Sequence, residues 1–457
     1  MLPSPQVRLA RFEGTGFGQK LLPLFSDSLT RPSQLSLMLV AMGWVMSGRE
    51  HRVASYLWRS GATDVKHFSS FYTWLERSIY PKLDKLWQRL IVKAASYVPE
   101  GELLVIKIDD SSRKKTGREI EGTSYYRNGA SGARQEKASI FGINLVIATL
   151  ELPLSWWPGA SLPVPVGLAV YLKERVAEQL GRPYYRRTEL ALHMLERLRE
   201  AVPERQLQVI ADGAYARRHF LPELPGQTDV ISRLPIDSKL YDFPTPPPKG
   251  KRGPKPKKGV LIGSAKTLVQ QPGWQPHPTE HGAEILVKAG LWHSVLPQVP
   301  IKVVFIRRLK QTKRRRGQRR DLEALFTTDL SLSAAEILKL YASRWGVEIT
   351  LRDSYAFYGL AQDACRKYPR IVAINSLRLI FAAAEVLWFI SRCQRRGRPQ
   401  LLTYRPWYRH KQAPSLNDVS MACREELFAQ GIIPTCGFWP HLSIIRGHSD
   451  ADFREAA

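Results

Sequence analysis

Two short apolar runs, far apart in the chain, each end in an aspartate. The first spans residues 103–111 and has Asp109 and Asp110 near its end, and the second spans residues 206–213 and ends at Asp212. Runs of this length and composition are typical of buried strands. If the two strands are neighbours in one sheet, their carboxylates lie side by side at the same edge. The pair therefore predicts an α/β domain with an acidic site.

A third carboxylate lies on a predicted helix. Apolar residues recur at helical spacing through residues 333–358, which predicts a single helix there. On that helix Tyr341, Arg344, Glu348 and Arg352 are three or four residues apart and share a face. Ion pairs on a solvated surface are the ordinary explanation of such a face. The two strand-end aspartates favour a different one, in which Glu348 joins them.

Three converging carboxylates need cations, because like charges repel strongly in a poorly polarisable interior. A site of two or three carboxylates suits Mg²⁺, with Mn²⁺ as an alternative. Two such ions can activate a water or a 3′-hydroxyl and stabilise the leaving oxygen of a phosphate. The chain has no Walker loop, and its ten histidines do not cluster at metal-ligand spacing. The candidates for catalysis and metal binding are Asp109, Asp212 and Glu348.

The charge of the chain indicates its partner. Lys and Arg number 68 against 41 Asp and Glu, a net charge of +27, which predicts binding to a polyanion, most simply nucleic acid. Four scattered cysteines without CxxC spacing indicate reduced thiols and a cytoplasmic location. Residues 1–19 lack the apolar core of a signal peptide. The most apolar run, 371–390, carries charged residues and is expected to be a buried helix, so no membrane partner is expected.

The predicted secondary structure changes along the chain from helices to strands and back to a long helix. Residues 1–30 have no regular pattern, and four helices are predicted before residue 100; one segment, 67–75, is either a DNA-recognition helix or part of a plain helical scaffold. Later strands are predicted at 103–111, 137–150, 164–172, 206–213 and 228–234, helices at 187–201 and 216–221, short strands at 260–262, 283–288, 301–307 and 324–329, and a long helix at 370–396. The resulting division is a helical, DNA-binding part (1–100), the first part of a catalytic core (101–235), a basic β-rich insertion (236–300), the second part of the core with Glu348 (301–398) and a tail without an assigned role (399–457).

The insertion contains a strongly basic, proline-rich segment, residues 244–258. It cannot form a core of its own, and it is either a solvated linker or a strand that follows a phosphate backbone. Its charge density favours DNA contact. The candidate residues are Lys249, Lys251, Arg252, Lys255, Lys257 and Lys258. A second basic run, 310–320, is predicted to form the tip of a hairpin.

Three motifs together carry a resemblance. They are Ile108-Asp109-Asp110-Ser111, residues 209–213 (Val-Ile-Ala-Asp-Gly), and Tyr341-x-x-Arg344-Trp345-x-x-Glu348. Over roughly residues 100–370 the chain resembles the DDE transposases of bacterial cut-and-paste insertion sequences. The resemblance implies an RNase H-like core, a mixed sheet with flanking helices, interrupted by a β-rich insertion. The Asp-x-Ser pattern favours Asp109 over Asp110, which faces the opposite side of the strand.

The resemblance also implies roles and partners. Tyr341 and Arg344 would contact the transposon end, and Trp274 or Trp292 would stack on a flipped base. The activity implied is Mg²⁺-dependent cleavage of inverted-repeat ends and their joining to target DNA, by a homodimer on paired ends in a prokaryotic cytoplasm, associated with the nucleoid. The family has a lysine seven positions after the glutamate, where this chain has Tyr355; Arg352 is a candidate for the missing charge. A catalytically silent DNA-binding protein that recruits partners, and an RNase H-like nuclease without strand transfer, are the alternatives.

Overall fold

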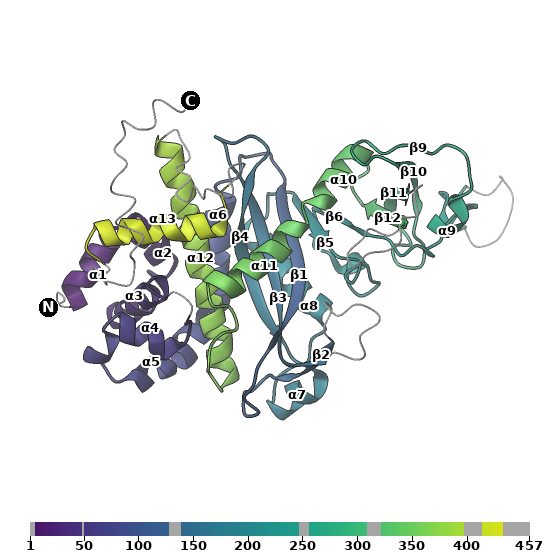
Figure 1. The fold of residues 1–457 in the computed structure, drawn as a ribbon. Coiled ribbons are helices and arrows are strands. Elements are labelled where there is room, and N and C mark those ends of the chain that lie inside the picture. The colour runs from purple at the N-terminus through teal and green to yellow at the C-terminus, as the bar shows by residue number, and fades with distance from the viewer. Residues whose placement is uncertain are drawn as a thin grey trace.

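One mixed sheet runs through the molecule, and the helices are arranged around it (Figure 1). The computed structural model describes residues 5–47, 50–127, 139–245, 256–308, 321–396 and 414–432. Within these residues the sheet has 12 strands in the order β2-β3-β1-β5-β6-β12-β11-β10-β7-β8, with β4 paired to β3 and β9 paired to β10.

The part of the sheet that carries the predicted acids has the RNase H-like arrangement. β1 (Leu104–Lys114) pairs antiparallel with β3 (Ser139–Pro153) and parallel with β5 (Leu207–Ala211). β5 continues parallel to β6 (Thr228–Arg233), and β4 (Ser161–Tyr171) pairs antiparallel with β3. The predicted neighbourhood of the two strands that end in aspartate is therefore confirmed, as is the RNase H-like fold class. A short strand, β2 (Ser124–Arg127), was not predicted.

The strands after β6 extend the same sheet. β12 (Leu322–Thr327) returns antiparallel beside β6, and β11 (Pro300–Arg308) and β10 (Ala283–Leu291) continue outward from it. The small elements of this region are β7 (Leu240–Tyr241), β8 (Leu261–Gly263), α9 (Ala265–Leu268) and β9 (Gln275–Pro276). In Figure 1 these elements lie on the opposite side of the central strands from the N-terminal helices.

The N-terminal region is helical from residue 5. Its helices are α1 (Pro5–Gly14), α2 (Gly16–Leu21), α3 (Arg31–Val45), α4 (Val53–Arg59), α5 (Phe68–Trp74) and α6 (Leu83–Ala95). The prediction that residues 1–30 are irregular was wrong for α1 and α2. The Thr15 hydroxyl caps α2 by accepting from the Gly18 N–H at 2.8 Å, and Phe12 and Phe17 are fully buried. Because such short helices depend on tertiary packing, the local sequence pattern does not reveal them.

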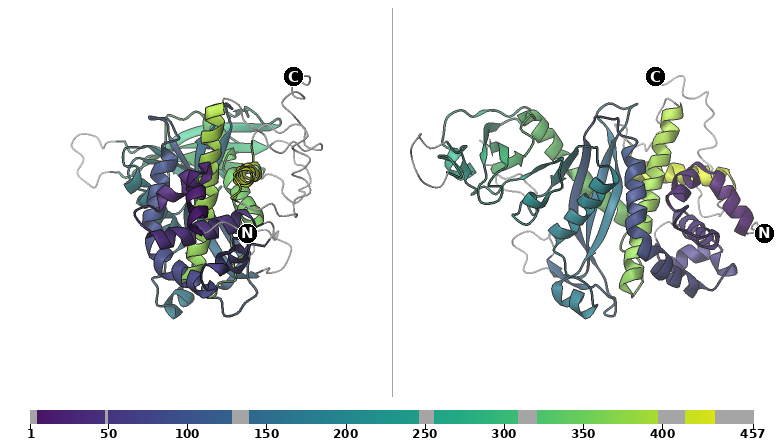
Figure 2. Two further views of the ribbon diagram at one scale, coloured as in Figure 1. Left: turned by 90° about the vertical axis from the view of Figure 1, so that its left-hand side faces the viewer. Right: turned by 180° about the vertical axis from the view of Figure 1, so that it is seen from behind.

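Two helices cover opposite faces of the central strands. α11 (Trp345–Phe357) crosses one face in Figure 1, and α8 (Arg187–Ala201) lies on the other, as the right-hand view of Figure 2 shows. α8 has the predicted bounds, and α7 (Glu174–Gln179) precedes it. The helix predicted at 216–221 is instead a series of turns that ends in a 3₁₀ helix, Leu221–Glu223, because local turn bonds begin at the Asp212 carbonyl.

The longest helix, α12 (Tyr368–Arg396), is part of the core. It packs against β4, α2, α6 and α13 (Leu416–Ala429). In the described part of the chain, one helix, Tyr368–Arg395, is long and apolar enough to cross a membrane, and its apolar window is wholly buried within the protein.

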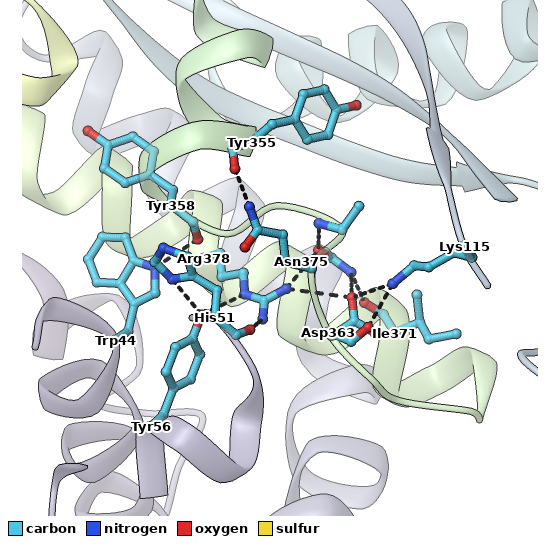
Figure 3. A network of polar contacts seen from close by, with 12 residues as sticks. Trp44, His51, Tyr56, Lys115, Tyr355, Tyr358, Asp363, Ile371, Asn375 and Arg378 are labelled. Carbon is cyan, nitrogen blue, oxygen red and sulfur yellow. Dashed lines mark hydrogen bonds and ion pairs between the residues drawn. The ribbon is translucent and has the colours of Figure 1, made fainter. Parts of the chain in front are cut away.

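A buried polar network joins α12 to three other parts of the chain (Figure 3). The Arg378 guanidinium lies 3.5 Å from the Asp363 carboxylate and donates to the Tyr56 hydroxyl at 3.0 Å. The Lys115 ammonium, just past β1, lies 3.5 Å from the same carboxylate. Asn375 also donates to it at 3.0 Å. The network therefore ties the end of β1 and the loop after α11 to α12 and α4.

Candidate active site

Asp109 and Asp212 lie at the same edge of the sheet. In the parallel register of β1 and β5, Ile108 pairs with Ala211. Each aspartate directly follows one member of this pair, so their backbones are about one strand spacing apart, roughly 4.8 Å. All five residues of β5 are buried. Apolar packing thus holds the strand whose end presents Asp212.

The helix predicted over residues 333–358 is two helices. α10 (Ala334–Ala342) and α11 are separated at Ser343 and Arg344. At the break, backbone N–H groups donate to carbonyls three residues earlier, and the Ser343 hydroxyl donates to a carbonyl of the preceding turn at 2.6 Å. These bonds tighten the chain into a 3₁₀-like turn, which a helical spacing of apolar residues does not reveal.

Arg344 joins Asp109 to Glu348. One terminal nitrogen of its guanidinium lies 3.3 Å from Asp109 Oδ2, and the other lies 2.7 Å from Glu348 Oε1. The contact with Asp109 connects residues 235 positions apart in the chain. The Arg344 side chain is only 11% exposed, so its charge is poorly solvated and is balanced by the two carboxylates. Two of the three predicted acids therefore lie within the span of one guanidinium.

Asp212 has a different partner. An Arg233 terminal nitrogen lies 3.9 Å from Asp212 Oδ1, and its second terminal nitrogen lies 2.6 Å from Glu323 Oε1. Glu323 also pairs with Arg308 at 3.2 Å. Arg233 therefore divides its charge between the strand-end aspartate and a carboxylate on β12. This chain of ion pairs connects the acids to the strands that follow β6.

The Tyr341 ring lies close to both guanidiniums of the site. Its centroid is 5.8 Å from the Arg233 guanidinium carbon and 5.9 Å from that of Arg344. The ring is buried, and its hydroxyl has no hydrogen-bond partner among the described residues. Burial raises the pKa of Tyr341, and the two arginines partly offset this. The tyrosine therefore contacts both guanidiniums as a neutral ring.

Asp109 is poorly solvated. Burial raises the pKa of Asp109 to about 7; the Asp110 N–H and Arg344 oppose the rise, and the charges of Asp110 and Glu348 add to it. An additional cation would stabilise the ionised form of such a carboxyl group and lower its pKa.

Tyr215 is buried in the turn that follows Asp212, where its N–H donates to the Asp212 carbonyl at 2.9 Å. Burial raises the pKa of Tyr215 well above its usual value, and Asp110, Asp109 and Asp212 add to the shift. The Tyr215 hydroxyl has no hydrogen-bond partner among the described residues.

The donor set fits a divalent metal. Asp109, Asp212 and Glu348 offer only carboxylate oxygens, which hard cations prefer, and Arg344 and Arg233 supply the balancing charge in this structure. As they are placed here, no three metal-ligating side chains of the described ranges converge closely enough to hold an ion. The sharing of metal ions by all three acids stays a prediction.

Asp110 faces the other side of the sheet. Its Oδ2 lies 2.7 Å from an Arg187 terminal nitrogen, on α8, and accepts from Asn144 at 3.0 Å. Asp109, by contrast, contacts Arg344 beside α11. The alternation of side chains along β1 therefore directs the two neighbouring aspartates to different helices.

Lys107 of β1 lies against the first turn of α11. It lies two residues before Asp109 on the same face of β1, is almost fully buried and pairs with Glu151 at 2.9 Å. A β-carbon on Gly346, in the first turn of α11, would be 2.9 Å from the Lys107 ammonium. The glycine therefore lets the helix that carries Glu348 approach β1 closely.

The remaining predicted DNA-binding residues lie in varied surroundings. Arg352 is 70% exposed and pairs with its neighbour Asp353 at 3.0 Å. Lys257 and Lys258 are exposed, and the Lys258 ammonium lies 4.1 Å from the centre of the Tyr241 ring. Lys249, Lys251, Arg252 and Lys255, and the basic run 310–320, lie outside the described residues.

The two tryptophans proposed to stack on a base are engaged within the protein. Trp292 is 4% exposed and packs edge-on against Phe326 at 5.6 Å. Trp274 is half-buried, and the Arg307 guanidinium carbon lies 4.4 Å from the centre of the Trp274 ring. These contacts favour a core role for Trp292, and a stacking role for either ring stays a prediction.

Sequence reasoning missed Arg233, Glu323 and Tyr215. Arg233 ends β6, the parallel neighbour of β5, so the rule that placed Asp109 and Asp212 at one edge also places Arg233 there. Glu323 is part of an apolar strand, and a buried charge in such a strand indicates a fixed partner. Tyr215 had no comparable signal, because its position depends on the turn after Asp212.

Comparison with known families agrees with this geometry. A family model described as DDE superfamily endonuclease matches residues 25–285. The matched segment contains β1 and β5 with Asp109 and Asp212, whereas Glu348 lies beyond it. A search of curated proteins found no match. Because the family match covers more than half of the 457 residues, the chain belongs to the DDE superfamily endonuclease family.

Proposed function

We propose that this protein is a DNA transposase that binds the inverted-repeat ends of its element, cleaves them and joins them to target DNA. Family membership supports a nuclease that acts on DNA with a divalent metal. The observation that carries the proposal further is the Arg344 bridge, which brings Glu348 of α11 next to Asp109 of β1. Asp212, at the end of the neighbouring strand β5, is the proposed third acid.

Each residue has a proposed role. Asp109, Asp212 and Glu348 hold divalent ions, Mg²⁺ or alternatively Mn²⁺, which when bound activate the attacking hydroxyl and stabilise the leaving oxygen. In the absence of metal, Arg344 and Arg233 neutralise the acids. With metal bound to the acids, the two arginines would be available to DNA phosphates. Tyr341 supports both guanidiniums with its ring, whose centre lies 5.8 Å from one and 5.9 Å from the other.

The proposed partners follow from charge. A net charge of +27 favours duplex DNA, both transposon ends and target. The basic residues Lys249, Lys251, Arg252, Lys255, Lys257 and Lys258 would strengthen the hold on the backbone. We propose a homodimer on paired ends, acting in the cytoplasm at the nucleoid.

The direct test uses the inverted repeats that flank the gene for this protein. Purified protein with Mg²⁺ is expected to cut a labelled end at the repeat boundary and, with a target plasmid present, to produce joined molecules. EDTA should stop both reactions. Cleavage without joining would favour a nuclease without strand transfer, and binding without cleavage would favour a silent DNA-binding protein.

Metal affinity is expected to depend on pH through Asp109. Only the ionised carboxylate binds a cation, and burial raises the pKa of Asp109 to about 7. Below that pH the proton competes, so the apparent affinity for Mn²⁺ should fall about tenfold for each pH unit. Calorimetric titration of the protein with Mn²⁺ between pH 5.5 and 8.5 measures this. An affinity that stays constant from pH 6 to pH 8 would contradict the assignment of Asp109 as a ligand.

A further inference from the structure

β1 carries another cation on the face that presents Asp109. Because side chains alternate along a strand, Arg113, four residues after Asp109, lies on the same face. Its guanidinium carbon is 4.3 Å from the centre of the Tyr355 ring. Tyr355 lies on α11, seven residues and about two turns beyond Glu348. Arg113 therefore places a positive charge next to the acidic site, where β1 packs against α11.

The stacked pair is exposed on one side and buried on the other. The Tyr355 ring is 6% exposed, whereas Arg113 is an exposed residue. A guanidinium that stacks on an aromatic face keeps its N–H groups in the ring-parallel plane, directed away from the ring. The buried ring thus holds an exposed cation in one place and leaves its hydrogen-bond donors accessible.

Arg113 differs from the other guanidiniums around the acids in its lack of a carboxylate. Arg344 pairs with Asp109 and Glu348, and Arg233 with Asp212 and Glu323. Across the ranges that the structure describes, no acidic side chain pairs with Arg113. Arg352, also on α11, is neutralised by Asp353. A fixed, unneutralised guanidinium beside a nuclease site is suited to an anion that the protein itself does not provide.

We propose that Arg113 binds a backbone phosphate of the DNA strand that enters the acidic site, and that Tyr355 is the positioning residue that holds its guanidinium. The inference rests on the proposed function, because it takes DNA as the anion. Four strand residues span about 13 Å, so the bound phosphate lies several nucleotides from the one that is cut. Pre-positioning by the ring reduces the entropy lost when the contact forms.

The test measures binding of a labelled duplex that contains the inverted-repeat end, by gel shift in Ca²⁺ at several salt concentrations. Arg113→Ala is expected to weaken binding about 10- to 100-fold and to reduce the log–log salt slope by about 0.9, the value for one lost phosphate contact. Arg366→Ala is the matched control, since it removes an exposed arginine that Glu119 already neutralises at 2.8 Å. It should change affinity less than threefold.

A scan of single methylphosphonates along the end locates the contact. With the parent protein, a neutral linkage at one position distant from the cleavage site should weaken binding. The Arg113→Ala variant should bind equally well with or without that neutral linkage, while neutral linkages elsewhere should still weaken its binding. A response of Arg113→Ala identical to that of the parent at every linkage would overturn the inference.

Variants at Tyr355 test the positioning role. Tyr355→Phe keeps the ring and should bind as the parent does, whereas Tyr355→Leu keeps an apolar side chain but loses the aromatic face and should weaken binding at the same linkage as Arg113→Ala. Equal binding by the Phe and Leu variants would contradict a role for the ring. Absence of Mg²⁺-dependent cleavage by the parent would instead count against the proposed function, and the binding measurements keep the two results separate.

Discussion

Glu348→Gln is expected to fold, to bind the transposon end at least as tightly as the parent, and to lose cleavage by about a thousandfold or more. The amide keeps the size of the side chain but removes the charge that holds a divalent ion. Charge stabilisation by such an ion is worth several kcal/mol, and each loss of about 1.4 kcal/mol slows a reaction tenfold. Binding should not fall, because one negative charge facing the phosphates has been removed. Gel shift and Mg²⁺-dependent cleavage are measured on the same labelled end.

Two comparisons define this result. Asp110→Asn is the matched control, because Asp110 neighbours Asp109 but contacts Arg187 and Asn144 on the other side of the sheet. It should retain most of the cleavage, whereas Asp109→Asn should behave like Glu348→Gln. If Glu348→Gln cuts at the parental rate, Glu348 is only the ion-pair partner of Arg344, and the acidic site as described is wrong.

Arg344→Ala should give a different pattern. The guanidinium is proposed to hold DNA after the metal has displaced it from the acids, so both binding and cleavage should fall. The expected loss of binding is about 1–3 kcal/mol, as for a charge-assisted contact.

Asp363→Ala is expected to destabilise the folded protein by about 3–5 kcal/mol, the range found when one partner of a buried ion pair is removed. Asp363 is fully buried and lies 3.5 Å from both the Arg378 and the Lys115 charges (Figure 3). Its loss leaves two buried cations without a carboxylate. Urea unfolding followed by far-UV circular dichroism measures the change, and a shift of the midpoint without a change of slope indicates lost stability.

A surface pair provides the control for this stability change. Glu119 and Arg366 lie 2.8 Å apart, but both side chains are more than 70% exposed. Glu119→Ala should therefore change stability by about 1 kcal/mol at most, although the pair is closer than either contact of Asp363. An effect of Asp363→Ala as small as that of Glu119→Ala would show that solvent reaches the network.

The sequence by itself determined the strands of the catalytic part and the positions of the acids along the chain. The strands β1 and β5 are recognisable because burial on both faces requires continuous apolar runs, and each of these runs ends in aspartate. The long helix α12 is recognisable for the same reason. Local turns were less accessible: the break at Ser343 and the turns after Asp212 depend on a few hydrogen bonds that leave no periodic signal.

Only the tertiary structure decided which side chains meet. The Asp-x-Ser pattern favours Asp109 over Asp110, but their different partners follow only from the placement of α11 on one face of β1 and α8 on the other. The contacts of Arg233 with Asp212 and of Arg113 with Tyr355 also follow only from the tertiary structure. Strand pairing and helix packing bring these residues together, and no spacing along the chain relates them. The free energy of these contacts comes from desolvated charges and stacked rings. It depends on distance in space, which local sequence patterns do not encode.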